Sequence, residues 1–362
     1  MAKKLAFDRV LFTTVMVLVG LGVAIVYSAS AVVAGEGGGR PYYYLYKQLV
    51  AVAVGLAAMG VAMHVDYRNL ARRWLVWGLV GGVIGMQAVV LVSPTLNSAR
   101  RWLIVGGLSF QPSELAKVAI VVFLAYQIAK RPPERRGMHL VVPVALVVGP
   151  MAAMVLVGRD LAGASLLAAA AGLMLFLSGL SWLHLGLGAL GLAPVVLSAI
   201  LAVPYRRERV MAFLRPESVD PLAAGFQPAQ SLIALGSGGL FGVGLGKSLQ
   251  KLYFLPYPHS DYVFAIVGEE LGLVGALGVL AAFGVLAWRG VRAGFRAPDE
   301  HGRYLAWGLT GMILVQALIH VSVSVGIFPA TGVTLPFISY GGSSLAVSLL
   351  AVGVVLNVSQ HG

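Results

Sequence analysis

The chain has 362 residues, of which 59% are hydrophobic and only 11% are charged. A soluble domain carries about 25% charged residues, and a soluble chain of this size could not remove so much apolar surface from water. The composition therefore excludes a cytosolic globular enzyme and a disordered protein. It predicts an all-α, polytopic integral membrane protein.

The net charge of +12 arises from 26 Lys and Arg against 14 Asp and Glu. The basic residues are scattered through short polar breaks between apolar stretches, so we expect no nucleic-acid partner and interpret the excess as a topology signal. The chain contains no Cys, which excludes disulfides, thiolate chemistry and Cys-ligated metals.

Ten apolar stretches are each close to the roughly 20 residues that a membrane-spanning helix needs. In chain order they are 11–34, 44–64, 74–94, 113–129, 139–157, 161–179, 181–203, 263–288, 303–326 and 335–359. Lys and Arg are more frequent in the loops that share a side with the two ends of the chain. We therefore expect both termini in the cytoplasm, in a single membrane domain covering residues 1–362.

One loop on the outer side, residues 204–262, is much longer than the others. Loops of this length are usually functional or disordered. Its apolar stretches and the Gly-rich segment Gly236–Gly246 predict packed, partly re-entrant structure. The end of this segment resembles a phosphate-binding P-loop, but the motif needs Gly where the chain has Phe241, so we reject that interpretation.

Five acidic residues lie at or inside the ends of predicted spans, where ionisable groups are costly and indicate function. Glu114 lies three positions before Lys117, on the same helical face. The two form either a self-neutralising pair or a site in which Lys117 presents a cation to a ligand phosphate. Arg100 and Arg101, just upstream, would add two more cations at the outer mouth of the protein.

Asp160 follows Arg159 at the start of the sixth predicted span, and we expect either a local ion pair or a polar group inside a cavity. Glu269 and Glu270 are adjacent on a helix, so their side chains point in different directions and cannot both face lipid. At least one of them should face the interior, as the partner of a cation or of a helix N-terminus.

Asp261 lies at the outer membrane boundary, where the long loop enters the eighth predicted span. It is either an ordinary N-cap or a carboxylate that meets a lipid-linked substrate, in which case burial would raise its pKa and make it a better base. His259 and Asp261 alone do not make a zinc site.

The segment Pro329-Ala-Thr-Gly-Val-Thr-Leu-Pro-Phe-Ile-Ser-Tyr-Gly-Gly-Ser-Ser344 resembles the signature of the shape, elongation, division and sporulation (SEDS) family. Further segments resemble the family in the same order along the chain: 100–102, 111–117, 209–221, 225–227 and 258–272. The resemblance covers nearly the whole chain. The short termini resemble the elongation branch of the family more than the division branch.

The resemblance implies a ten-span peptidoglycan glycosyltransferase of the bacterial cytoplasmic (inner) membrane. Such an enzyme polymerises lipid II on the outer face, in complex with a class B penicillin-binding protein, and the essential aspartate of the family falls on Asp261. The sequence departs from the family twice: Gly158-Arg159 replaces the usual Gln-Pro before Asp160, and His320 replaces a usual Asn.

Inverting displacement of undecaprenyl diphosphate needs one base, which we assign to Asp261, and cations at the leaving group. We predict a substrate-binding set for this reaction: Arg100, Arg101, Glu114, Lys117, Asp160, Arg209, His259, Glu269 and Glu270. No cofactor is evident, and a divalent metal at the diphosphate is left open because no ligand cluster indicates it.

Two other functions compete with the enzyme. A lipid II flippase would use a polar cavity lined by Glu114, Lys117 and Asp160, but it needs polar groups at the midplane and on both faces. A scaffold would only recruit the crosslinking partner. The candidate groups lie toward the outer face, so the sequence favours the enzyme.

Overall fold

The computed structural model describes residues 6–35, 42–93, 99–105, 108–132, 136, 138–215, 225–252 and 254–362. The α-helices are α1 (Arg9–Gly35), α2 (Tyr43–His64), α3 (Arg73–Val92), α4 (Pro112–Ala129), α5 (Met138–Val157), α6 (Leu161–Leu177), α7 (Trp182–Leu201), α8 (Pro204–Leu214), α9 (Phe226–Ser237), α10 (Val263–Arg296), α11 (Glu300–Ser324) and α12 (Gly342–Ser359). A short 3-10 helix, η2 (Tyr67–Ala71), follows α2. The strands β1 (Leu103–Val105) and β2 (Leu108–Phe110) pair antiparallel before α4.

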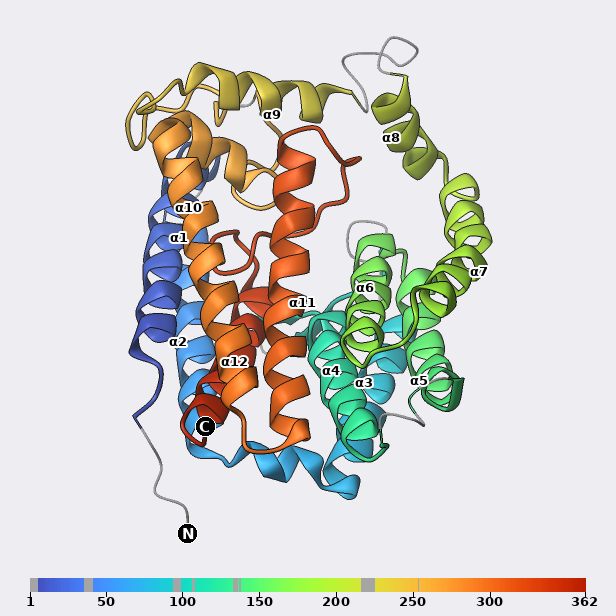
Figure 1. The fold of residues 1–362 in the computed structure, drawn as a ribbon. Helices are drawn as coiled ribbons and strands as arrows, with labels where there is room; N and C mark the ends of the chain where they lie inside the picture. The colour runs from blue at the N-terminus through green and yellow to red at the C-terminus, as the bar shows by residue number, and fades with distance from the viewer. Residues whose placement is uncertain are drawn as a thin grey trace.

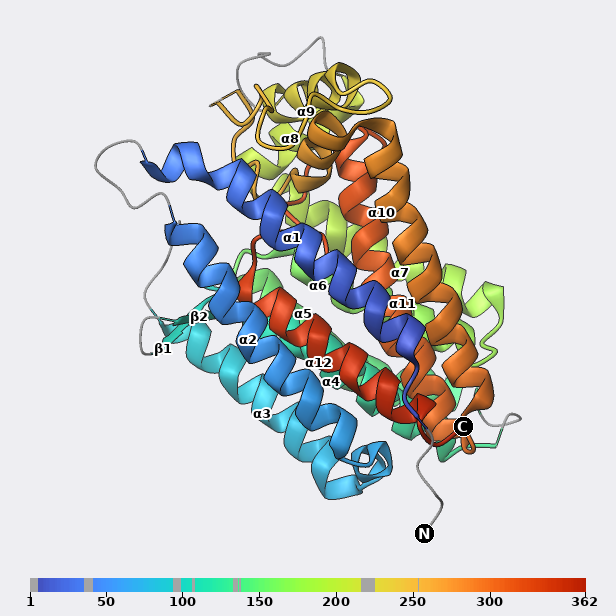
Figure 2. The same cartoon turned by 90° about the vertical axis from the view of Figure 1, so that its left-hand side faces the viewer.

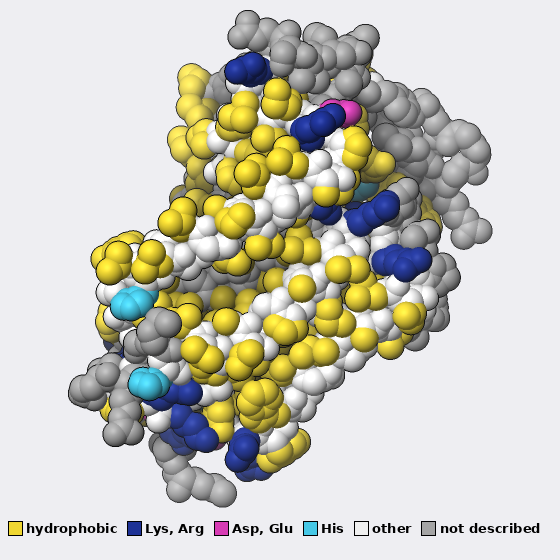
Figure 3. Space-filling model, turned by 90° about the vertical axis from the view of Figure 1, so that its right-hand side faces the viewer, with side chains coloured by type: hydrophobic (Ala, Val, Ile, Leu, Met, Phe, Trp, Pro, Cys, Tyr) yellow, Lys and Arg dark blue, Asp and Glu magenta, His cyan; other side chains and the backbone are white. Residues whose placement is uncertain are grey.

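The helices confirm a predominantly helical, multi-pass membrane protein. Nine helices among the described residues are long and apolar enough to cross a membrane, and α6, with 17 residues, is a shorter apolar helix. The count of ten spans therefore stays a prediction. Apolar side chains are spread over the face seen in Figure 3, and Lys and Arg lie mainly toward its upper part and its lower left.

The last predicted span, 335–359, is wrong at its start, because residues 335–341 are not helical and α12 begins at Gly342. Pro336 disfavours a helix through the residue before it, and Phe337 adopts a left-handed conformation with φ of 68°. Leu335, Phe337 and Ile338 are nevertheless at most 1% exposed. A buried loop and a membrane-spanning helix have the same hydropathy, so composition could not separate them.

The start of α1 and the C-terminus lie at the same end of the bundle, and α8 and α9 lie at the opposite end (Figure 1). This arrangement agrees with the predicted topology, in which both termini share one side. We call the end that carries α8 and α9 the outer end.

Close contacts between small residues hold the central helices together. The α2 and α12 helices run side by side (Figure 2), and the position of a Cβ on Gly55 of α2 would lie 3.1 Å from the Cα of Ala346 in α12. At a second contact of the same two helices, Gly353 of α12 lies against Met59 and Ala62 of α2. Small residues at such crossings allow close approach of the backbones, which drives helix association in lipid.

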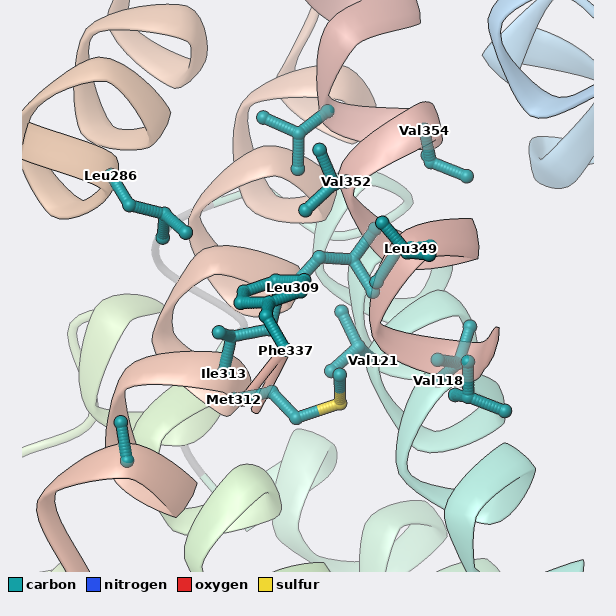
Figure 4. Packing of buried hydrophobic residues seen from close by; sticks show 14 of the residues in the cluster. Val118, Val121, Leu286, Leu309, Met312, Ile313, Phe337, Leu349, Val352 and Val354 are labelled. Carbon is teal, nitrogen blue, oxygen red and sulfur yellow. The ribbon is translucent and has the colours of Figure 1, made fainter. Parts of the chain in front are cut away.

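The apolar core lies where α4, α10, α11 and α12 meet (Figure 4). Leu309 and Ile313 of α11 pack there with Val121 of α4, and Phe337 inserts from the buried loop before α12. Every residue of α4 from Ala116 to Ile128 is buried, which makes α4 the central helix. A polar side chain on α4 must therefore find its partners inside the protein.

The described part of the long outer segment contacts α10 at a break in that helix, whereas the predicted structure of the whole segment stays a prediction. Gly272 interrupts α10 with φ of 68° and ψ of −167°, which releases backbone groups from the helical ladder. The carbonyls of Glu269 and Glu270 accept hydrogen bonds from the amides of Val243 (2.9 Å) and Gly244 (3.0 Å). The amides released beyond Gly272 donate back to the same loop, so the break leaves these buried groups satisfied.

Candidate functional site

An open cavity of about 180 Å³, called the large cavity below, lies at the outer end, between α6, α7, α8, α11 and the segment 328–333. Its polar lining includes four arginines and one carboxylate: Arg101, Arg159, Arg206, Arg209 and Asp160. The rest of the wall is largely apolar, with Leu161, Val196, Ile200, Ile319 and Phe328 among its residues. The cavity is thus both electropositive and apolar, which suits an anionic group attached to a lipid.

Asp261 lies half-buried directly behind this wall. The position of a Cβ on Gly332 would lie 3.4 Å from Oδ2 of Asp261, and the neighbours Thr331 and Val333 line the cavity. Burial raises the pKa of the Asp261 carboxyl, while a hydrogen bond from Ser260 Oγ (2.9 Å) and the charges of Arg209 and Arg101 act to lower it. The carboxylate is therefore a stronger base than an exposed aspartate.

The C-terminal signature segment holds the turn that presents Asp261. The amide of Tyr340 donates to the carbonyl of His259 (2.8 Å), and Ser339 Oγ donates to the carbonyl of Ser260 (2.7 Å). Two of the segments that resemble the SEDS family, 258–272 and the signature 329–344, are thus held together by bonds, one of which joins residues 79 positions apart in the chain.

His259 packs against protein aromatics. Its ring centroid lies 4.6 Å from that of Tyr44 and 5.5 Å from that of Tyr340. Burial lowers the pKa of His259 to about 4, so the ring is neutral near pH 7. These contacts indicate that His259 helps to position the Asp261 turn, and its role in substrate binding stays a prediction.

The predicted cations occupy different settings. Arg101 and Arg209 both line the large cavity. Arg209 Nη1 donates to the carbonyl of Ala330 (3.4 Å), and its guanidinium lies 5.2 Å from the ring centroid of Tyr205. Arg100 is exposed, donates to the carbonyl of Leu91 (2.9 Å), and lines a smaller cavity that Arg101 also borders.

Asp160 is an N-cap and a cavity residue at once. Its carboxylate accepts hydrogen bonds from the amide of Gly163 (2.8 Å), from Gln111 Nε2 (2.8 Å) and from Ser113 Oγ (3.5 Å). It lines both cavities next to Arg101. The cavity alternative from the sequence is thus supported, although neutral donors already engage this carboxylate.

Glu114 and Lys117 form the self-neutralising pair that the sequence offered as one alternative. Their charged groups lie 2.8 Å apart, and Lys117 Nζ also donates to Gln316 Oε1 at 2.5 Å. Gln316 in turn donates to Thr334 Oγ1 and Ser344 Oγ of the signature. In the described part of the chain neither Glu114 nor Lys117 lines the large cavity, so the pair supports the fold beneath the site.

Glu269 and Glu270 are both buried, and each is engaged by the outer loop. Glu269 accepts hydrogen bonds from the hydroxyl of Ser248 and the amide of Leu249, and Glu270 pairs with Lys251 Nζ at 3.0 Å. Ser28 of α1 donates to Glu270 at 2.5 Å. The pairing of Glu270 with Lys251 is the interior cation partner that the sequence offered as an alternative, and a substrate-binding role for the two carboxylates stays a prediction.

The sequence analysis missed Arg159 and Arg206 as cavity residues. Arg206 precedes Arg209 by three positions in α8, so the two share a helical face. That spacing was the available signal, but it indicates a site only when the other walls are known. Among the described residues no group of three or more His, Asp or Glu forms a cluster able to hold a metal ion.

The chain is similar to known proteins over nearly its full length. Residues 8–362 match the FtsW/RodA/SpoVE family, described as cell cycle proteins. Stage V sporulation protein E of Bacillus subtilis is 40% identical over 99% of this chain and 98% of its own length. A probable peptidoglycan glycosyltransferase FtsW of Geobacter sp. (strain M18) is 38% identical over 98% of this chain and 97% of its own length.

Solved structures show the same fold. A chain of a peptidoglycan synthase complex, described for its structural coordination of polymerization and crosslinking, has a TM-score of 0.80 at 35% identity, covering 98% of both chains. Rod shape determining protein RodA of Thermus thermophilus has a TM-score of 0.72 at 31% identity, covering 98% of this chain and 97% of that one.

Proposed function

Because the chain belongs to the FtsW/RodA/SpoVE family of cell cycle proteins, we propose that it is a peptidoglycan glycosyltransferase that polymerises lipid II. It does so at the outer face of a bacterial cytoplasmic membrane. The observation that carries the proposal is the position of Asp261, a half-buried carboxylate of raised pKa behind a cavity lined by arginines. The printed names of relatives, which include probable peptidoglycan glycosyltransferases, support the same activity.

The reaction needs a base and a place for the leaving group. Asp261 accepts the proton of the 4-hydroxyl of the incoming sugar while that oxygen attacks the anomeric carbon of the donor. The bond from this carbon to the diphosphate breaks, and the diphosphate leaves with the electron pair. A base in this position contributes roughly 10²- to 10⁴-fold to the rate.

The arginines lining the cavity supply the charge that the leaving group needs. Arg101 and Arg209 lie close enough to Asp261 for their charges to act on its carboxyl. Cations held in advance near the departing diphosphate stabilise the charge that develops there. The electropositive lining favours the anion directly, and a divalent metal stays a prediction from the chemistry of diphosphates alone.

The proposals for the cellular process and the partner rest on the comparisons with known proteins rather than on the geometry of the site. We propose cell elongation as the process because a rod shape determining protein, RodA, has the same fold, although the relatives compared also include FtsW and a sporulation protein. We infer a class B penicillin-binding protein as the partner because a similar chain is part of a complex that coordinates polymerization and crosslinking.

A lipid II flippase is the second candidate, and the structure disfavours it. The deep polar cluster that a flippase would use consists of Glu114, Lys117 and Gln316. The Lys117 side chain is 3% exposed and bonded to both partners, so this cation is already engaged within the protein and is not offered to a lipid headgroup.

The decisive experiment compares Asp261→Asn with wild type in strand synthesis from purified lipid II, with the crosslinking partner present. We expect a loss of at least about 10²-fold. The matched control is Glu208→Gln, which neutralises an exposed carboxylate on α8 and should retain activity. Full polymerisation by Asp261→Asn would refute the assignment of the base. Lipid II translocation without strand growth by wild type would establish the flippase instead.

A further inference from the structure

Arg206 is a buried cation with unused hydrogen-bonding capacity. Its side chain is 7% exposed, and Nη1 donates to the carbonyl of Ala199 at 3.0 Å. The buried Nε and Nη2 atoms have no hydrogen-bond partner among the described residues. A guanidinium cannot lose its proton to relieve this cost. Burial of an unpaired charge is expensive, so this group calls for an anionic ligand.

The surroundings of Arg206 show where that ligand would lie. Arg206 lines the large cavity together with Arg209, one helical turn later, and with Arg101 and Arg159 on other walls. The one carboxylate among the described lining residues, Asp160, already accepts hydrogen bonds from Gln111, Ser113 and the α6 backbone. Among the described lining residues, Arg101, Arg206 and Arg209 therefore outnumber the one carboxylate, and Arg101 and Arg206 keep buried nitrogens without a hydrogen-bond partner.

The rest of the wall indicates what the anion is attached to. Val196 and Ile200 of α7, Leu161 of α6 and Ile319 of α11 line the same cavity. None of the residues of α7 is buried within the protein, so this helix lies on the apolar exterior of the bundle beside the cavity. A ligand with an anionic head and an apolar chain would satisfy both kinds of lining.

Two features favour a diphosphate over a single phosphate. Several arginines from different elements line one cavity, which matches a group of more than one negative charge. Arg206 and Arg209 also present two guanidiniums along one face of α8, so adjacent phosphates could each meet a separate cation.

We propose that Arg206 binds the diphosphate of the polyprenyl-linked substrate at the α8 wall of this cavity, an inference that rests on the proposed function. Arg206 acts on the leaving group, whereas Asp261 acts on the attacking hydroxyl. Loss of Arg206 therefore weakens binding of the prenyl diphosphate and does not remove the base.

The test measures binding of farnesyl diphosphate, a short prenyl diphosphate, to the purified full-length protein in detergent. Arg206→Gln should weaken binding by about 10- to 100-fold, because it removes charge-assisted hydrogen bonds worth roughly 1.5–3 kcal/mol. Arg206→Lys keeps the charge but loses the planar fork, and should bind with intermediate affinity. The matched control is Arg207→Gln, which neutralises the exposed next residue and should bind like wild type.

Binding of two further ligands identifies which kind of anionic group the site prefers. Farnesyl monophosphate and vesicles containing phosphatidylglycerol are tested in the same way. Weaker dependence on Arg206 for these two ligands supports the proposal. Equal or greater dependence for phosphatidylglycerol would overturn it in favour of a lipid headgroup site, as would wild-type affinity of Arg206→Gln for farnesyl diphosphate. If Arg206→Gln does not fold, the ratio between Arg206→Lys and wild type decides.

The two proposals fail separately. Strand synthesis that depends on Asp261, combined with diphosphate binding that ignores Arg206, would refute only the role of Arg206. Diphosphate binding that depends on Arg206, in a protein that does not polymerise lipid II, would refute only the enzymatic function. In the active enzyme, Arg206→Gln should raise the KM for lipid II more than it lowers kcat.

Discussion

Asp261, which is half-buried, and the buried Glu269–Glu270 pair are acids close together in sequence, yet their surroundings differ. The glutamates are closed in by the outer loop, with Lys251 and loop amides as partners. Asp261 has Ser260 as its hydrogen-bond partner in the described structure and lies behind a cavity in which Arg101 and Arg206 keep buried nitrogens without a partner. All three carboxylates are at least partly buried, so burial alone does not distinguish a functional acid. We interpret an incomplete set of hydrogen-bond partners beside a cavity as the distinguishing feature.

The largest expected effect comes from removing one charge of the buried Glu270–Lys251 pair. Glu270→Gln leaves Lys251 buried without its counter-charge and should reduce the free energy of unfolding by about 3–5 kcal/mol. The measurement is the thermal unfolding midpoint in detergent. The double variant Glu270→Gln/Lys251→Met removes both charges and should recover much of the loss. A midpoint like that of wild type for Glu270→Gln would contradict the structural role.

The next effect tests how the outer loop packs on the break in α10. Gly242 and Gly246 both have φ of 80°, but a Cβ on Gly242 would overlap the carbonyl of Glu270, whereas Gly246 has open space around it. Gly246→Ala should lose roughly 1 kcal/mol through backbone strain. Gly242→Ala should lose more, by roughly 1–3 kcal/mol for overpacking. Equal unfolding midpoints for the two variants would show that the loop does not pack there.

A smaller effect, of opposite sign, is expected at Asp261. Its folded-state pKa is raised by burial, so the neutral carboxyl stabilises the fold at low pH and this stability is lost as pH rises through the folded pKa. Asp261→Asn mimics the neutral form and should raise the unfolding midpoint at neutral pH by roughly 2–4 °C. The difference from wild type should vanish as pH falls toward the unfolded-state pKa, and a lower midpoint at neutral pH would contradict it.

The smallest expected effect is a shift in the pH dependence of the rate of strand synthesis. A base must be ionised, so strand synthesis should decline as pH falls through the raised pKa of Asp261. Arg209→Gln removes a positive charge that lowers this pKa and should move the decline to higher pH. Initial rates of both proteins across pH measure the shift. An unchanged profile would show that Arg209 does not act on the carboxyl.

Several elements could be predicted from the sequence because their signals are local. Nine of the predicted apolar stretches correspond to helices that meet the length and hydropathy needed to cross a membrane, since both properties can be counted along the chain. The start of α12 could not be predicted in this way. Residues 335–341 are apolar because protein covers them, and hydropathy does not distinguish protein from lipid as the apolar surroundings.

The residues of the candidate site were likewise only partly predictable from local sequence. Asp261 was found because scarce charge at a span end is informative, and the family resemblance selected it from five acids. The roles of Glu269, Glu270 and His259 depended on partners far away in sequence, such as Ser28, Lys251 and Tyr44. Nothing in the local sequence distinguishes an acid that a loop will cap from one that will face a cavity.

The scarcity of charge in an apolar chain by itself determined the class of the protein and the small set of acids from which a base could come. Only the tertiary structure decided which of these acids is engaged and which is available. The reason is physical: the free energy of a buried charge depends on the groups around it in space. Arg206 shows this most clearly, because its unpaired nitrogens become meaningful only once α6, α7, α8 and α11 enclose a common cavity.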